Sequence, residues 1–125
     1  MKFETLSIEN GNIAVLTGDF VIRTVDDALD VIANAGYQTG YDRLIIHKEN
    51  LDPDFFELKT GFAGEILQKF TTYRMKVGII GDFSEINSKS LRDFIYESNK
   101  NKMIVFAGTI EGAIGIWYGN PSGAG

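Results

Sequence analysis

The chain begins with alternating apolar and polar positions that predict two short strands. Leu6 and Ile8 alternate with polar residues, and an apolar run over 13–16 follows after a break. The break is Asn10-Gly11, a pair that signals a β-hairpin between apolar runs because both residue types tolerate a positive φ. We therefore expect an N-terminal hairpin with antiparallel strands.

Apolar residues recur at helical spacing over residues 25–33. Thr24 is a suitable N-cap for this helix, and Asp27, three residues later, completes a capping box. Gly36 supplies the stop, because glycine suits the left-handed position after a helix. The pattern predicts a helix that ends at about residue 35.

Three short, continuous apolar runs indicate strands buried on both faces: 44–46, 77–80 and 103–106. Two helical stretches lie between them. The first runs from about Pro53 to Thr71, with Asp52 as its N-cap, and the second runs from about 89 to 99, with a capping box from Ser90 to Asp93. A short last helix over 109–118, held by a buried Trp117, is also expected.

This order of elements predicts an α/β fold. We expect a five-stranded mixed, mostly parallel sheet with the N-terminal hairpin, three to four helices and right-handed crossovers. No repeat or linker divides the chain, so residues 1–118 are expected to form a single domain. Glycine is frequent near the end, and residues 119–125 are expected to be a disordered tail.

Charge and composition exclude several classes of function. The chain has 12 basic and 17 acidic residues and a net charge of −5, which argues against binding to nucleic acid or to anionic membranes. It has no cysteine and a single histidine, His47, so thiolate chemistry and sites that need two histidines are ruled out. The phosphate-loop, dinucleotide-binding and nucleophile-elbow motifs are absent. We expect no cofactor and no metal.

We expect no targeting segment and no membrane segment in this sequence. The first residues carry an acid, Glu4, where a signal peptide has an apolar run, and no apolar stretch approaches the roughly 18 residues of a membrane span. We therefore expect a cytoplasmic protein.

Polar residues follow the predicted strands, where ligands gather in open α/β sheets. Candidates for a small-ligand or anion site are His47, Asp82, Ser84 and Thr109. His47 is also a candidate general base for a small hydrolase, with Ser84 or Thr109 as nucleophile and Asp82 as the orienting acid. The alternative interpretation is that strand ends are polar only because loops are solvated.

Two glycines, Gly61 and Gly64, fall in the middle of the predicted helix over 53–71. One interpretation is that they allow this helix to pack tightly on the sheet. In another, the helix begins near Thr60 after a short turn, which places the Thr60 hydroxyl at a helix N-terminus. A third, an RNA-binding Gly-x-x-Gly clamp, is disfavoured by the acidic balance and the absence of flanking basic residues.

Longer segments resemble a known bacterial family. They are the segments 55–61, 64–70, 81–84 and 88–99, which read FFELKTG, GEILQKF, GDFS and SKSLRDFIYESN. Together they resemble the family known as domain of unknown function 4180. The resemblance covers nearly half of the chain and implies no particular activity.

A second, more distant resemblance rests on the order of elements and on the segment Thr60-Gly61-Phe62-Ala63. Both are similar to the sulfate transporter and anti-sigma-factor antagonist (STAS) domains. In that superfamily a Ser or Thr before Gly at this place can be phosphorylated, which switches partner binding. The resemblance implies that Thr60 is a switch position, with Gly61 as its neighbour.

The sequence thus favours a non-enzymatic interaction or regulatory module. Its partner is expected to be a protein, or a second copy of the chain, bound near Thr60 and the strand ends, with Gly61 and Gly64 in the same region. The alternatives are a small-ligand or anion-binding domain at the strand ends and a small hydrolase that depends on His47.

Overall fold

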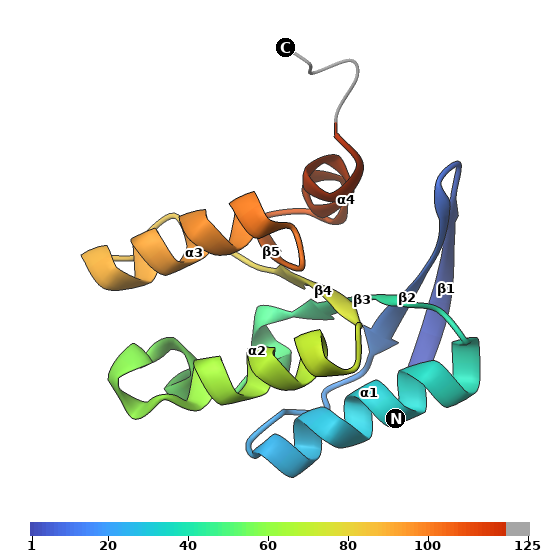
Figure 1. Cartoon of the computed structure of the whole chain (residues 1–125), viewed down its shortest axis with the longest axis horizontal. Coiled ribbons are helices and arrows are strands. Elements are labelled where there is room, and N and C mark those ends of the chain that lie inside the picture. The colour runs from blue at the N-terminus through green and yellow to red at the C-terminus, as the bar shows by residue number, and fades with distance from the viewer. Residues whose placement is uncertain (120–125) are drawn as a thin grey trace.

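The sheet has five strands that lie side by side in chain order (Figure 1). A computed structural model describes residues 1–119. The strands among them are β1 (Lys2–Ile8), β2 (Gly11–Thr17), β3 (Arg43–His47), β4 (Lys76–Ile80) and β5 (Ile104–Ala107). β1 and β2 are antiparallel and the other neighbours are parallel, which confirms the predicted fold class. The tail expected over 119–125 lies outside the described residues, apart from Gly119.

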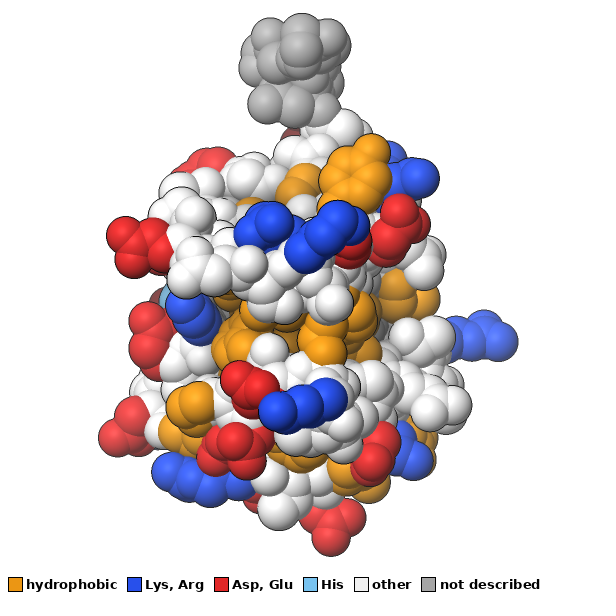
Figure 2. All heavy atoms as spheres, turned by 90° about the vertical axis from the view of Figure 1, so that its left-hand side faces the viewer, with side chains coloured by type: hydrophobic (Ala, Val, Ile, Leu, Met, Phe, Trp, Pro, Cys, Tyr) orange, Lys and Arg blue, Asp and Glu red, His pale blue; other side chains and the backbone are white. Residues whose placement is uncertain are grey.

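The described residues also form four α-helices, α1 (Val25–Thr39), α2 (Phe62–Thr72), α3 (Lys89–Asn101) and α4 (Ile110–Tyr118). Three single 3₁₀ turns lie between β3 and α2: η1 (Lys48–Asn50), η2 (Pro53–Phe56) and η3 (Leu58–Thr60). The carboxyl ends of β3 and β4 and the first turns of α1, α2 and α3 lie on the left of Figure 1, the side that Figure 2 shows face on. None of the helices within residues 1–119 has the length and apolar character needed to cross a bilayer.

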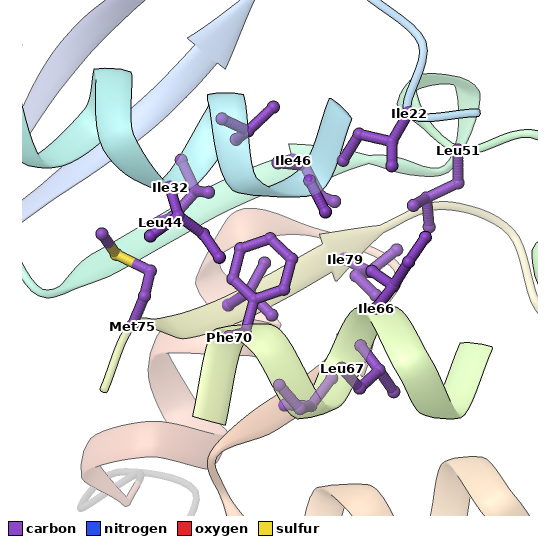
Figure 3. Close-up of a cluster of buried hydrophobic side chains, with 14 of the residues drawn as sticks. Ile22, Ile32, Leu44, Ile46, Leu51, Ile66, Leu67, Phe70, Met75 and Ile79 are labelled. Carbon is purple, nitrogen blue, oxygen red and sulfur yellow. The ribbon is translucent and has the colours of Figure 1, made fainter. Parts of the chain in front are cut away.

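The alternation of side chains along the strands divides the apolar residues between two faces of the sheet. Leu44 and Ile46 of β3 face the main core beneath α1 and α2, whereas Ile45 faces α4. In Figure 3, Phe70 and Ile66 point from α2 towards the strand residues of this main core. The continuous apolar runs of the central strands are explained by this burial on both sides.

The helix α4 lies close to the sheet because β4 carries a glycine beneath it. A Cβ added to Gly78 would lie 3.1 Å from Cη2 of Trp117 and 3.3 Å from Cβ of Ala113. Trp117 is 7% exposed and Ala113 is fully buried. The expected helix held by Trp117 is therefore present, and Thr109 is its N-cap.

The N-terminal hairpin is confirmed, with its turn one residue earlier than the Asn-Gly signal suggests. Ile8 pairs with Gly11, so Glu9 and Asn10 are the turn residues. Gly11 has a φ of 145° and begins β2. The glycine is thus needed at the first strand position rather than inside the turn.

Two predicted helix boundaries are wrong. α1 has the predicted Thr24–Asp27 capping box but continues past Gly36 to Gly40, whose φ is 73°. Gly36 is exposed and costs the helix only about 1 kcal/mol, so the next left-handed glycine ends it instead. At α3 the cap is Ser88, which accepts a hydrogen bond from the Leu91 N–H, and the predicted Ser90–Asp93 box does not form.

The helix predicted over 53–71 is also wrong as one continuous helix. Asp52 caps η2 with Pro53 at the first position, as expected, but the backbone then breaks at Glu57 and again at Gly61, which has a φ of 77°. The interpretation in which the helix begins near Thr60 is therefore the correct one, with α2 beginning at Phe62.

The packing of α4 leads to a stability prediction. Trp117→Ala removes a buried indole from the sheet, and we expect the free energy of unfolding to fall by about 3–5 kcal/mol. Tyr37→Ala is the control, because Tyr37 is 93% exposed, and we expect a change within about 0.5 kcal/mol. Urea unfolding followed by circular dichroism measures both. Equal stabilities of the two variants would contradict the assigned packing.

Candidate functional site

A groove of about 640 Å³ opens at the carboxyl ends of the strands. We call it the carboxyl-edge groove. It lies between the segment with η1 and η2 on one side and the connection from β4 to α3 on the other. Figure 2 shows hydrophobic side chains gathered across the middle of this side of the molecule, with charged side chains above and below. Its lining residues are Val21, Arg23, Lys48, Glu49, Leu51, Asp52, Pro53, Phe56, Phe83, Ile86 and Leu91.

Aromatic rings form much of the apolar wall. Phe56 and Phe83 have ring centroids 6.1 Å apart, and Phe83 packs edge-on against Phe106 of β5 at 5.5 Å. Both Phe56 and Phe83 are half-buried and contact the main core. Each ring is therefore held in place from behind and presents its remaining surface to the groove.

Lys48 is the cation closest to these rings. Its Nζ lies 5.4 Å from the Phe83 ring centroid and 5.8 Å from the Phe56 centroid, and it donates a 3.0 Å hydrogen bond to the Asp82 carbonyl oxygen. The stem of Lys48 crosses Gly81, where an added Cβ would lie 2.6 Å from the Lys48 Cβ. Gly81 is thus the glycine that allows Lys48 to reach across the end of β4.

The buried side chain of Asn50, which is 3% exposed, holds together the two segments that form one wall of the groove. Its Oδ1 accepts a hydrogen bond from the His47 N–H, and its Nδ2 donates to the carbonyl of Phe20. Beside it, Ile22 and Leu51 form a parallel β-bridge. These contacts hold the segment between β2 and α1 against η1.

Asp82 and Ser84 are brought together in the turn after β4. The Asp82 carboxylate accepts hydrogen bonds from the Ser84 hydroxyl at 2.5 Å and from the Ser84 N–H at 2.9 Å. These bonds, assisted by the Lys48 charge, hold the pKa of Asp82 below its usual value. Both residues line a second hollow, of about 480 Å³, on the other side of Phe83.

The structure does not bring His47 or Thr109 to that pair. His47 is half-buried and lines a separate hollow with Gly18, Asp19 and Asn50. Thr109 accepts a hydrogen bond from the Gly112 N–H as the cap of α4. Within residues 1–119, His47 makes no hydrogen bond to Asp82, Ser84 or Thr109, so the base and nucleophile of the hydrolase hypothesis are not paired.

Thr60 lies at the start of α2, beside the groove segment rather than in the groove lining. Its hydroxyl donates to the Glu57 carbonyl at 2.9 Å and accepts from the Phe62 N–H at 3.2 Å. Gly61 follows as the left-handed N-cap of the helix. Gly64 is exposed and nothing lies within 4 Å of an added Cβ, so the prediction that Gly61 and Gly64 allow tight packing on the sheet is wrong.

The groove residues were not predicted from the sequence, whose site candidates are polar residues at the strand ends. Phe56, Phe83 and Leu91 are apolar, and a sequence pattern does not distinguish apolar groove residues from core residues. Lys48 directly follows the candidate His47 at a strand end but was not among the predicted site residues. A usable signal is the glycine directly after a buried strand, here Gly81, because it marks a close approach by another segment.

The family described as "Domain of unknown function (DUF4180)" matches residues 9–116, and the chain therefore belongs to this family. No curated protein and no solved structure matches the chain. The resemblance to the STAS domains is not confirmed by these comparisons.

The two glycine environments lead to opposite predictions for the same substitution. Gly81→Ala forces the Lys48 stem off the end of β4, and we expect a loss of about 1–3 kcal/mol in the free energy of unfolding. Gly64→Ala, on an exposed helix position with open space, is expected to gain about 0.5–1 kcal/mol. Urea unfolding by circular dichroism compares them. A loss of stability in Gly64→Ala, or a gain in Gly81→Ala, would contradict the assignments.

Proposed function

We propose that this DUF4180 protein is a non-enzymatic interaction module that binds an apolar segment of a protein partner in the carboxyl-edge groove. The observation that carries the proposal is the groove itself. Two half-buried phenylalanines, Phe56 and Phe83, pack against the main core and expose their remaining surface to the groove. Interface cores are enriched in aromatic side chains and poor in charge.

The groove has the shape and lining to receive apolar side chains. Phe56 lies on the η2 side of the groove, and Phe83, Ile86 and Leu91 lie on the side formed by the β4–α3 connection and the start of α3. Arg23, Glu49 and Asp52 also line it, so charges of both signs border the apolar floor. This arrangement of an apolar centre and a polar rim is typical of protein interfaces.

Thr60 is the proposed regulatory position of this module. It is exposed and follows Phe56 by four residues on the segment that forms the groove wall. A phosphate on its hydroxyl would remove the hydrogen bond that this hydroxyl donates to the Glu57 carbonyl and would add negative charge at this turn. Modification there is therefore proposed to alter the conformation of the wall and, through it, partner binding.

The partner proposal is tested with a groove substitution that leaves the core intact. Ile86→Asp places a charge in the groove at a half-buried residue outside the main apolar clusters. We expect proteins that co-purify with the tagged wild type from its own cells to fall at least about tenfold in quantitative mass spectrometry. Tyr96→Asp is the control, because Tyr96 is 64% exposed and lies outside the groove lining.

Circular dichroism and thermal unfolding confirm that both variants are folded. An unchanged set of co-purified proteins in Ile86→Asp would overturn the proposal. Thr60→Glu and Thr60→Ala are compared in the same experiment, and identical partners in both would remove the switch while leaving groove binding in place.

A small anionic ligand is the second candidate occupant, and the position of Lys48 is the observation that favours it. The ammonium is fixed between two rings and keeps N–H groups beyond the one bonded to Asp82. The groove volume also falls within the range of about 300–1,000 Å³ typical of small-molecule sites. The ligand chemistry would be a carboxylate attached to an apolar or aromatic body.

Decanoate, phenylacetate and inorganic phosphate are suitable probes in a thermal-shift experiment. We expect one of the apolar carboxylates to raise Tm by several degrees at concentrations far above its Kd, and phosphate to have no effect. Lys48→Met should abolish the rise, whereas Lys89→Met, at a lysine whose side chain is 81% exposed, should preserve it. No rise with either carboxylate, or an equal rise in Lys48→Met, rules this candidate out.

A further inference from the structure

The two edges of the sheet differ in whether their outward backbone groups have hydrogen-bond partners. At the β5 edge, Asn99 of α3 uses its amide on the backbone of Phe106: Oδ1 accepts from the Phe106 N–H at 2.7 Å, and Nδ2 donates to the Phe106 carbonyl at 3.1 Å. α3 also packs on β5. The outward backbone groups at the centre of this edge are therefore already paired.

The β1 edge has no such cover within the described residues. Ile8 pairs with Gly11 across a two-residue turn, so Lys2, Glu4, Leu6 and Ile8 direct their backbone groups towards β2. The N–H and C=O groups of the alternate residues, Phe3, Thr5 and Ser7, point away from the sheet. Hydrogen bonds from side chains reach the carbonyls of Met1 and Lys2 but none of these three residues.

β1 also lacks the bulge and the proline that prevent many edge strands from pairing, and its charges are limited to Lys2 and Glu4. Its register with β2 is continuous over all seven residue pairs, so it has no bulge, and it contains no proline. The strand lies at the outer side of the sheet (Figure 1). Natural sheets block exposed edges with bulges, prolines, covering segments or charges, and an unblocked edge is a template for another strand.

We propose that β1 pairs antiparallel with β1 of a second copy of the chain, around a two-fold axis at Thr5. In this register Thr5 opposes Thr5 of the second copy, and Phe3 opposes its Ser7. All six outward backbone groups of each copy are then paired, and the two sheets join into one of ten strands. Because the interface is isologous, it closes as a dimer.

The side chains of β1 favour this register over its neighbours. A pair of threonines directly opposite each other is favourable in antiparallel sheets. Glu4 opposes Leu6 and Lys2 opposes Ile8, so no like charges face each other. A register centred on Glu4 sets two carboxylates directly opposite, and registers centred on Phe3 or Leu6 leave outward groups of Ser7 or Phe3 unpaired.

The dimer is expected to be weak. One pair of seven-residue strands buries less than the roughly 1,200–2,000 Å² of a stable interface, so association should depend on concentration in the micromolar range or above. Sedimentation velocity of the wild-type chain over increasing concentrations should show a shift from monomer to dimer. A chain that stays monomeric at millimolar concentration overturns the proposal.

A charge pair at Thr5 tests the position of the axis. In Thr5→Lys, two lysines meet at the axis, and in Thr5→Asp, two aspartates meet there, so each variant should dimerise at least about tenfold more weakly than the wild type. A mixture of the two variants should restore the dimer as a heterodimer. Failure of the mixture to recover association contradicts the register.

Thr5→Pro tests the backbone hydrogen bonds. Proline removes the outward Thr5 N–H and leaves every β1–β2 hydrogen bond in place, because an edge strand tolerates proline where its N–H faces solvent. We expect the dimer to be lost. Circular dichroism and the fluorescence of Trp117, the single tryptophan, verify that the fold is retained.

A dimer that survives Thr5→Pro and both charge variants would show that another surface mediates association and overturn the proposal. Ile86→Asp should dimerise like the wild type, because Ile86 lines the groove and not the β1 edge. Failure of the dimer and failure of groove binding are therefore measured separately. Pairing of the edge only with a strand of a different protein also overturns the second copy as the occupant.

Discussion

The buried amide of Asn50 is the interaction on which the rest of the site depends. It joins two segments that are far apart in sequence, because it donates to the carbonyls of Gly18 and Phe20 and accepts from the His47 N–H. Through it the chain entering α1 is fixed against the chain leaving β3, and both contribute residues to one wall of the carboxyl-edge groove. A buried amide left unpaired costs about 1–3 kcal/mol, so loss of these partners would destabilise the wall by about that amount.

The groove itself follows from how the helices share the sheet. α2 packs on α1 and β4, whereas α3 packs on β5. The connection from β4 to α3 must therefore cover the distance between α2 and α3. Phe83 on this connection packs against Phe106, and Phe56 packs against Phe55. The two sides of the groove therefore contact each other through aromatic rings rather than through packed helices. Such an opening is where an α/β fold has room for a ligand.

Local signals predicted most of the fold, and tertiary contacts decided what they missed. The hairpin, the Thr24–Asp27 capping box and the buried central strands were all visible in the sequence, because each is set by neighbours within a few residues. Gly78 in the predicted strand and Gly81 directly after it were not recognised as positions of close approach, because the residues that approach them, Trp117 and Lys48, are distant in sequence. Gly64 was a candidate site residue in the sequence, but nothing lies within 4 Å of a Cβ added to it.

The difference between local signals and tertiary contacts also explains why neither proposed surface could be predicted from the sequence. Phe56 and Phe83 have the pattern of core residues, and only the fold leaves one side of each open. The β1 edge is open because chain-order pairing places the hairpin at the end of the sheet, while Asn99 closes the other end. The groove and the edge share no residue, so the proposed pairing at β1 and the proposed partner binding in the groove use separate surfaces of the molecule.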